Sequence, residues 1–241
     1  MNTPTATRHE TSAAELLKWS NIFEGLIQAA PDSSPDTRAT IRQAPSLVML
    51  KNGWGAKYIE PEELIGDQWH ATFVNASEQV ARAGIVAFYG NRGSGKTRMA
   101  AEIARAGRWP ADDGEWNGNH NVRSRTALYT RAMDIFLDLR DCSKKGADRS
   151  EKDVLKRLSA AGLLVIDELQ ERGETEWENR VVSNLLDKRY AADRPTILIA
   201  NLSREDLAKA LSPSVRDRMQ EQGKGFLFDW PSYRRDHAAR P

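Results

Sequence analysis

The sequence contains very little cysteine and no long apolar run. Cys142 is its single cysteine among 241 residues, which excludes an intramolecular disulfide and a zinc site built from several thiolates. No apolar stretch approaches the ~20 residues needed to cross a bilayer. The polar residues 1–10 also lack the apolar core of a signal peptide. We therefore expect a cytoplasmic protein that makes no membrane contact.

The chain also lacks an excess of either charge. It carries 35 Lys and Arg residues against 34 Asp and Glu residues, a formal net charge of +1. No global field therefore attracts it to nucleic acid, and any such contact must be local. The four histidines show no metal-ligand spacing: they are His9, His70, His120 and His237.

Residues 90–97 form a complete G-x-x-x-x-G-K-T phosphate loop directly after the apolar run 85–89. Its members are Gly90, Asn91, Arg92, Gly93, Ser94, Gly95, Lys96 and Thr97. The glycines let backbone N–H groups surround phosphates at the positive end of the next helix. Lys96 would reach the β and γ phosphates, and Thr97 would offer its hydroxyl to Mg²⁺. The sequence therefore predicts binding of ATP with Mg²⁺.

Two carboxylates follow the apolar run 163–166, at the spacing where a Walker B strand often follows a phosphate loop. We expect Asp167 to hold the Mg²⁺ shell and Glu168 to polarise the water that attacks the γ phosphate. Asn201 ends the next apolar run, 196–200. It would align the same water as a γ-phosphate sensor, although an asparagine here also suits a turn before a helix.

Apolar runs of strand length alternate with helical patterns from residue 85 onward. We expect strands at 85–89, 127–130, 163–166, 196–200 and 225–229, and helices at 96–106, 132–140, 177–189 and 204–211. Segments 109–124 and 142–152 are expected to be loops. Short apolar strands separated by helices predict an α/β fold, a parallel five-stranded sheet between helices.

Several ordered motifs between residues 163 and 234 resemble those of the DnaC-type helicase loaders and the related IstB-type transposition ATPases. These motifs read Leu-Leu-Val-Ile-Asp-Glu-Leu, Ile-Ala-Asn-Leu, Ser-Val-Arg-Asp-Arg-Met and Phe-Asp-Trp-Pro-Ser-Tyr-Arg. Both families are AAA+ P-loop NTPases, and the resemblance covers about residues 80–235. It implies an AAA+ fold, and because the chain ends soon after residue 234 we expect no C-terminal lid domain.

The resemblance also implies roles for two arginines. Arg218 matches the family's arginine finger, which enters the active site of a neighbouring subunit and stabilises charge on the γ phosphate. The alternative is a solvated helix face on which Arg218 pairs with Asp217 or Glu221. Arg234 matches the second sensor position, although Arg235 beside it leaves the choice open. Tyr58 and Ile59 are purine neighbours by family position only.

Loaders of this type grip single-stranded DNA, which directs attention to aromatic and basic residues outside the core. Trp177 would stack on a base, a contact worth about 1–3 kcal/mol, or anchor its own helix. Lys144 and Lys145 follow the predicted helix 132–140, in the segment that initiators and loaders use for DNA. A solvated charge run is the alternative there.

The first 60 residues lie outside the resemblance. A capping pattern at Ser12 precedes an apolar stripe at Leu16, Trp19, Phe23 and Leu26, which predicts an amphipathic helix. This stripe suits a helix-in-groove contact with a replicative helicase, or folding back onto the ATPase core. We therefore divide the chain into a helical partner-binding segment with its linker, 1–55, and an AAA+ ATPase domain, 56–241.

These observations favour an ATP-dependent loader that delivers a replicative helicase to single-stranded DNA. We expect a weak ATPase that is stimulated at a subunit interface and assembles into a ring or spiral with ATP. An IstB-like transposition helper shares every motif and differs in its partner. A phosphate loop also suits a P-loop small-molecule kinase or a nucleotide-regulated adaptor without turnover. Glu168 and Asn201 argue against the kinase because both suit water activation.

Overall fold

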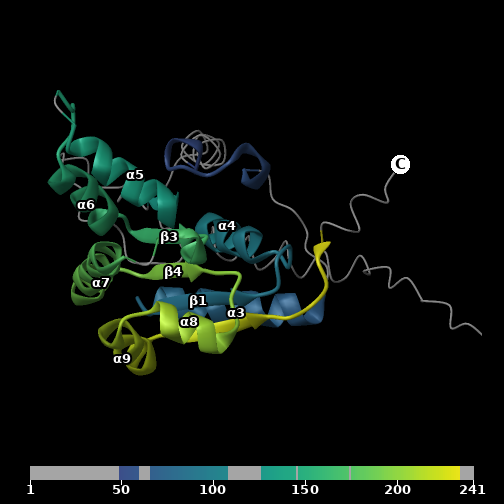
Figure 1. Cartoon of the computed structure of the whole chain (residues 1–241). Helices are drawn as coiled ribbons and strands as arrows, with labels where there is room; N and C mark the ends of the chain where they lie inside the picture. The colour runs from purple at the N-terminus through teal and green to yellow at the C-terminus, as the bar shows by residue number, and fades with distance from the viewer. Residues whose placement is uncertain (1–48, 60–65, 108–125, 145, 174, 234–241) are drawn as a thin grey trace, which may run out of the picture. The chain divides into compact units, whose positions relative to one another are not determined.

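A computed structural model describes residues 49–59, 66–107, 126–144, 146–173 and 175–233, which lie within the compact unit Pro45–Pro241. In this part of the chain five parallel strands form one sheet in the order β2-β3-β4-β1-β5 (Figure 1). The strands are β1 (Ile85–Gly90), β2 (Ala127–Arg131), β3 (Leu163–Asp167), β4 (Thr196–Ile199) and β5 (Lys224–Phe228). The predicted parallel five-stranded α/β sheet is confirmed.

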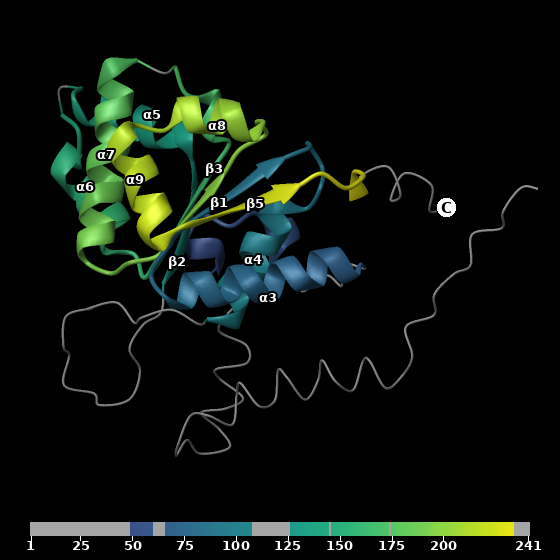
Figure 2. The same cartoon turned by 90° about the horizontal axis from the view of Figure 1, so that it is seen from below.

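Helices cover both faces of the sheet (Figure 2). They are α3 (Asp67–Ala81), α4 (Lys96–Ala106), α5 (Ala132–Cys142), α6 (Glu151–Ala160), α7 (Glu176–Ala191), α8 (Arg204–Ala210) and α9 (Pro213–Gln222), with short 3-10 turns η1 (Ala56–Tyr58) and η2 (Leu169–Glu171). Side chains alternate along each strand, so Leu164 and Ile166 face α5–α9 while Leu163 and Val165 face α3 and α4. The sheet is therefore buried on both sides, as parallel sheets are.

The sheet order decides which strand ends are neighbours. β4 pairs with β1 through Ile85↔Thr196 to Phe88↔Ile199, and with β3 through Leu164↔Thr196 to Ile166↔Leu198. The carboxyl ends of β1, β4 and β3 therefore lie side by side, with β4 in the middle. Ligands of open parallel sheets bind at such carboxyl ends.

Three helices were not predicted. Segment 142–152, expected to be a loop, contains the start of α6, where Ser150 and Asp153 form a capping box. α3 buries Trp69, Ala76 and Val80. α9 begins with Ser212 as its cap and Pro213 in its first turn.

The segment before η1 packs on the core around the sheet rather than belonging to a separate N-terminal segment. Met49 and Trp54 are buried, 5% and 2% exposed, and the Trp54 indole donates to the Ala127 carbonyl at 2.8 Å. The compact unit accordingly begins at Pro45, earlier than the predicted boundary after residue 55. The predicted N-terminal helix, with Leu16, Trp19, Phe23 and Leu26, and the predicted loop 109–124 lie outside the described residues.

Candidate nucleotide site

The phosphate loop joins β1 to α4 and depends on glycine. Gly90, Gly93 and Gly95 have φ values of 116°, 81° and 86°, which side chains rarely allow. A Cβ on Gly90 would lie 2.5 Å from the Phe228 carbonyl oxygen. Gly95, in the left-handed region, directly precedes the first turn of α4. The loop therefore keeps a compact path that brings backbone N–H groups to a helix N-terminus.

The Lys96 side chain binds carbonyl oxygens within this loop. Its ammonium donates to the carbonyl oxygens of Gly90 at 3.1 Å and Asn91 at 2.5 Å, and the residue is 5% exposed. The Ser94 hydroxyl donates to the same Asn91 carbonyl at 2.6 Å. The positive charge is thus held within the loop, where a bound triphosphate would need it.

The two residues predicted to hold Mg²⁺ are in contact. The Thr97 hydroxyl donates to Asp167 Oδ2 at 2.7 Å, and Asp167 is 5% exposed. Asp167 Oδ1 accepts the Glu168 backbone N–H at 2.7 Å, which fixes the carboxylate plane. A hydroxyl and a carboxylate at the carboxyl end of the sheet fit Mg²⁺, which prefers oxygen ligands and takes few from the protein.

Tyr129 is a member of this cluster that the sequence did not reveal. Its hydroxyl donates to Asp167 Oδ2 at 3.0 Å. Burial, followed by the negative charge of Asp167, raises the pKa of Tyr129 above its ordinary value. The phenol therefore stays protonated and acts as a fixed donor behind the carboxylate.

Glu168 has an unusual backbone for its position. Its φ and ψ are 54° and 43°, the left-handed region that costs a non-glycine residue about 1–2 kcal/mol. Ala83 and Asp193 also have positive φ, but both lie just beyond the C-caps of α3 and α7, where this conformation usually ends a helix. Glu168 ends no helix, and such backbone outliers cluster at functional sites.

Asn201 follows β4 and lies beside the phosphate loop. A cleft at the carboxyl end of the sheet is lined by Gly90, Asn91, Arg92, Gln170, Glu171, Asn201, Leu202, Ser203 and Leu227. The Asn201 backbone N–H donates to Gln170 Oε1 at 3.0 Å, so η2 holds the end of β4. The structure therefore brings Asn201 and the phosphate loop to one cleft.

Arg218 lies far from its own phosphate loop. It occupies α9, whose C-terminal end approaches the start of β1: a Cβ on Gly223 would lie 2.6 Å from the Ile85 carbonyl oxygen. The loop is at the other end of β1, and strands rise ~3.3 Å per residue. The structure therefore does not bring Arg218 to the cleft beside its own phosphate loop.

The partner of Arg218 differs from both residues considered in the sequence, Asp217 and Glu221. Its guanidinium donates to Asp187 of α7 and to the Ser214 hydroxyl, and lies 5.2 Å from the centre of the Tyr190 ring. This ion pair is partly exposed, 26% for Arg218 and 38% for Asp187.

The predicted DNA contacts occupy mixed positions. Trp177 is half-buried and its ring lies 5.7 Å from that of Phe136 in α5, which supports the anchoring alternative. Lys144 is 73% exposed and pairs with Asp141 at 2.5 Å. Lys145 and Arg234 lie outside the described residues.

Tyr58 and Ile59, expected near the purine, are held against α4. Arg105 donates to both of their carbonyl oxygens, and the Arg98 guanidinium lies 5.2 Å from the Tyr58 ring centre. Glu102, 9% exposed, pairs with both arginines. This ionic cluster fixes the segment before residue 60 beside the helix that follows the phosphate loop.

The described part of the chain contains no group of three or more His, Cys, Asp or Glu residues placed to hold a metal ion. None of its helices has the length and apolar character required to span a bilayer.

Comparison with known proteins gives the fold. In the crystal structure of the DnaC helicase loader, the match covers 70% of this chain and 92% of that one, with a TM-score of 0.51 and 21% identity. The replication initiator DnaA bound to AMPPCP and single-stranded DNA matches 70% of this chain and 49% of its own, with a TM-score of 0.52 and 17% identity. The described residues have the AAA+ P-loop NTPase fold.

The sequence of this chain resembles that of DnaC-type helicase loaders. The replicative helicase loader DnaC of Escherichia coli K12 is 30% identical over 148 residues, 61% of this chain. The chain spans 55% of the length of that relative. No protein-family profile matches the chain.

Proposed function

We propose that this AAA+ protein is an ATP-dependent helicase loader. The observation that carries the nucleotide part is the 2.7 Å contact of Thr97 with Asp167 directly after the phosphate loop. The resemblance to DnaC carries the choice of partner, a replicative helicase delivered to single-stranded DNA. The polar residues at the carboxyl end of the sheet support a switch operated by ATP binding and hydrolysis.

Each residue of the site has a distinct task in this proposal. Gly95 and Lys96 bind the phosphates, through backbone N–H and ammonium respectively. Thr97 and Asp167 would hold Mg²⁺, which supplies positive charge to the β and γ phosphate oxygens. Glu168 accepts a proton from the attacking water, and Asn201 orients that water.

Arg218 of a neighbouring subunit would complete the site. An arginine placed on the γ phosphate contributes about 10³–10⁵ in rate, so a protomer without a neighbour is a weak ATPase. The pairing of Arg218 with Asp187 supports this view because it keeps the guanidinium ordered on the surface until assembly replaces one anionic partner with another. Assembly into a ring or spiral would therefore stimulate hydrolysis.

The arginine finger is tested by Arg218→Ala with Arg216→Ala as control, since Arg216 is exposed on the same helix. We expect Arg218→Ala to keep nucleotide affinity and to lose at least about 100-fold of the ATPase rate measured with helicase and single-stranded DNA. Arg216→Ala should retain that rate. Full stimulated turnover in Arg218→Ala would exclude the interface role.

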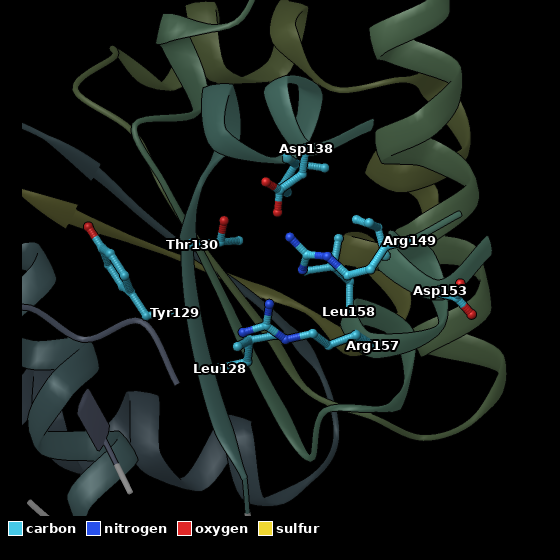
Figure 3. A pocket seen from close by; sticks show the side chains of 10 residues that line it. Leu128, Tyr129, Thr130, Asp138, Arg149, Asp153, Arg157 and Leu158 are labelled. Atoms are coloured by element: carbon cyan, nitrogen blue, oxygen red, sulfur yellow. The ribbon is translucent and has the colours of Figure 1, made fainter. Parts of the chain in front are cut away.

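A pocket beside the edge strand β2 supports a contact with single-stranded DNA. Figure 3 shows the guanidinium groups of Arg149 and Arg157 extending into this pocket, which Thr130 of β2 also lines. Both arginines are exposed and form no ion pair with a described residue. Phosphates of a single strand would therefore meet two guanidinium groups here.

This contact predicts a salt-dependent affinity. Arg157→Ala should weaken binding of oligo-dT and make the logarithm of the affinity fall less steeply with the logarithm of salt, by about 0.7 per lost phosphate contact. Fluorescence anisotropy at several salt concentrations measures both. An unchanged slope would place the DNA elsewhere, with Trp177 the next residue to test.

The partner is tested by affinity capture with the host's replicative helicase, with and without ATP. The full chain should retain the helicase, whereas residues 45–241 should lose it and still bind ATP, because the apolar stripe from Leu16 to Leu26 is then absent. Truncation at residue 45 is preferable to a later cut since Met49 and Trp54 are buried in the ATPase core. Capture of a transposase instead would favour the transposition helper.

A further inference from the structure

The residues after β5 run along the outside of the phosphate loop. We call residues 229–233 the C-terminal strap. The Trp230 indole N–H donates to the Ser94 carbonyl at 2.8 Å, and the Tyr233 backbone N–H donates to the Gly93 carbonyl at 3.1 Å. One hydrogen bond runs in the opposite direction: the side-chain amide of Asn91, in the loop, donates to the Asp229 carbonyl at 3.0 Å.

Trp230 is itself held in place. Its ring packs on Phe228 of β5 with centroids 4.7 Å apart, and Phe228 is fully buried. The Phe228 carbonyl in turn accepts the Asn91 backbone N–H at 2.8 Å. The strap is thus attached to the sheet at one end and to the loop along its length.

Peptide geometry turns these outer contacts into a constraint on the inner surface of the loop. In a trans peptide the C=O of one residue and the N–H of the next point in opposite directions, and the described residues contain no cis peptide. A Ser94 carbonyl held outward by Trp230 therefore directs the Gly95 N–H away from the strap. The Gly93 carbonyl, held by Tyr233, does the same for the Ser94 N–H.

We infer that Trp230 is a positioning residue of the nucleotide site, which orients phosphate-binding N–H groups of the loop by holding the Ser94 carbonyl from outside. The inference deepens the proposed function and rests on it. Ser94 is fully buried, so the strap, and not solvent, supplies the donor for its carbonyl. Affinity for phosphates is therefore set partly by a residue outside the phosphate-loop motif.

Binding must also act on the strap, because coupling between two sites is reciprocal. Phosphates that accept from the Ser94 and Gly95 N–H groups fix the same peptide planes whose carbonyls bind Trp230 and Tyr233. Bound nucleotide therefore strengthens the strap contacts. Exchange of the Tyr233 amide hydrogen should slow when nucleotide binds.

The test is Trp230→Phe in the full chain, which keeps an aromatic ring against Phe228 and removes the N–H. Loss of one hydrogen bond should weaken binding of Mg·ADP about three- to ten-fold, measured with a fluorescent ADP analogue. Pyrophosphate, used as a competitor, should lose the same factor because the defect lies in the phosphate loop. The matched control is Trp69→Phe: the buried Trp69 N–H has no hydrogen-bond partner among the described residues, so affinity should not change.

Three results would overturn the inference: equal ADP affinity of Trp230→Phe and the parent, weakening for ADP but not for pyrophosphate, or a Tyr233 amide whose exchange ADP leaves unchanged in the parent. The exchange measurement needs no variant, so it decides the question even where Trp230→Phe folds poorly. If the parent binds neither ADP nor pyrophosphate, the proposed function fails first. A parent that binds both, with an unaffected Trp230→Phe, removes only this inference.

Discussion

The two ends of the parallel sheet each contain a buried cation that binds carbonyl oxygens, with different consequences. At the amino end, Arg189 is fully buried and donates to the carbonyls of Leu158, Ser159, Ala161 and Pro195 and to the Thr196 hydroxyl. At the carboxyl end, Lys96 donates to two carbonyls of its own loop. Arg189 thus joins α6, α7 and β4, whereas Lys96 organises one local turn.

The same interaction, a buried cation that donates to backbone carbonyls, serves structure at one end of the sheet and ligand binding at the other. A guanidinium whose donors face fixed carbonyl and hydroxyl oxygens cannot serve a ligand, and its loss affects three elements at once. An ammonium that holds a loop with exposed members, such as Asn91, remains next to the space that phosphates would occupy. Replacements at the two ends should therefore affect different measurements.

Arg189→Met should have the largest effect, a loss of about 3–5 kcal/mol in the free energy of unfolding, because several buried carbonyls lose their donors together. Urea unfolding measures this loss. The control Arg180→Met, at an exposed position of α7, should change stability by less than about 0.5 kcal/mol. A loss below about 1 kcal/mol in Arg189→Met would mean that water replaces the guanidinium.

Lys96→Ala should show the opposite pattern. ATP affinity should fall about 30- to 150-fold, the equivalent of about 2–3 kcal/mol for hydrogen bonds to a charged group. Stability should fall by no more than about 1 kcal/mol, because the Ser94 hydroxyl still donates to the Asn91 carbonyl. Isothermal calorimetry and urea unfolding give the two values. Lys209→Ala, on the exposed surface of α8, should leave both unchanged, and undiminished ATP binding by Lys96→Ala would contradict the proposed site.

Tyr129→Phe should have a smaller effect that is confined to Mg²⁺. Partners behind a metal ligand typically change metal affinity by 10–100-fold, and we expect about ten-fold more Mg²⁺ for half-maximal ATPase at unchanged maximal rate. The raised pKa of Tyr129 keeps the phenol protonated, so the difference should persist from neutral to mildly alkaline pH. In the control Tyr89→Phe, the lost hydroxyl binds no described residue, and a similar shift there would show that the effect is nonspecific.

The predictable parts of the fold were those with local signals. The expected strands and helices after residue 85 differ from the observed bounds by at most two residues, because apolar periodicity and the phosphate loop define them locally. α6 carried a usable signal, the capping pair Ser150 and Asp153. The charged residues around this pair are also typical of a loop. The buried residues Trp69, Ala76 and Val80 of α3 have helical spacing, but polar residues separate them and weaken the apolar pattern.

The unpredicted parts of the site depend on the order of strands. Tyr129 reaches Asp167 because β2 pairs with β3, and Trp230 reaches Ser94 because β5 pairs with β1. These residues are 38 and 136 positions apart in the chain. No local sequence pattern predicts such a contact. The same holds for the hydrogen bond from Trp54 to Ala127, which makes residues before 55 part of the core.

Replacing Glu168 should have the smallest effect on the free energy of unfolding. It also allows a direct comparison of the two ends of the sheet, because Asp193 at the amino end has the same left-handed backbone. Glycine accepts this conformation without steric cost but is more flexible when unfolded. Glu168→Gly and Asp193→Gly should therefore each raise the free energy of unfolding by about 0.5–1 kcal/mol. Only Glu168→Gly should lose stimulated ATPase.

Glu168→Gln separates strain from chemistry at the same position. The amide keeps the side-chain shape and the strained backbone, so its stability should stay within about 0.5 kcal/mol of the parent. It cannot accept a proton from water, so hydrolysis should fall as far as in Glu168→Gly. Equal stability of the glycine and glutamine variants would mean that the left-handed turn after β3 stores no strain, whereas the expected difference would show that the protein tolerates a less stable backbone to place a carboxylate beside Asp167.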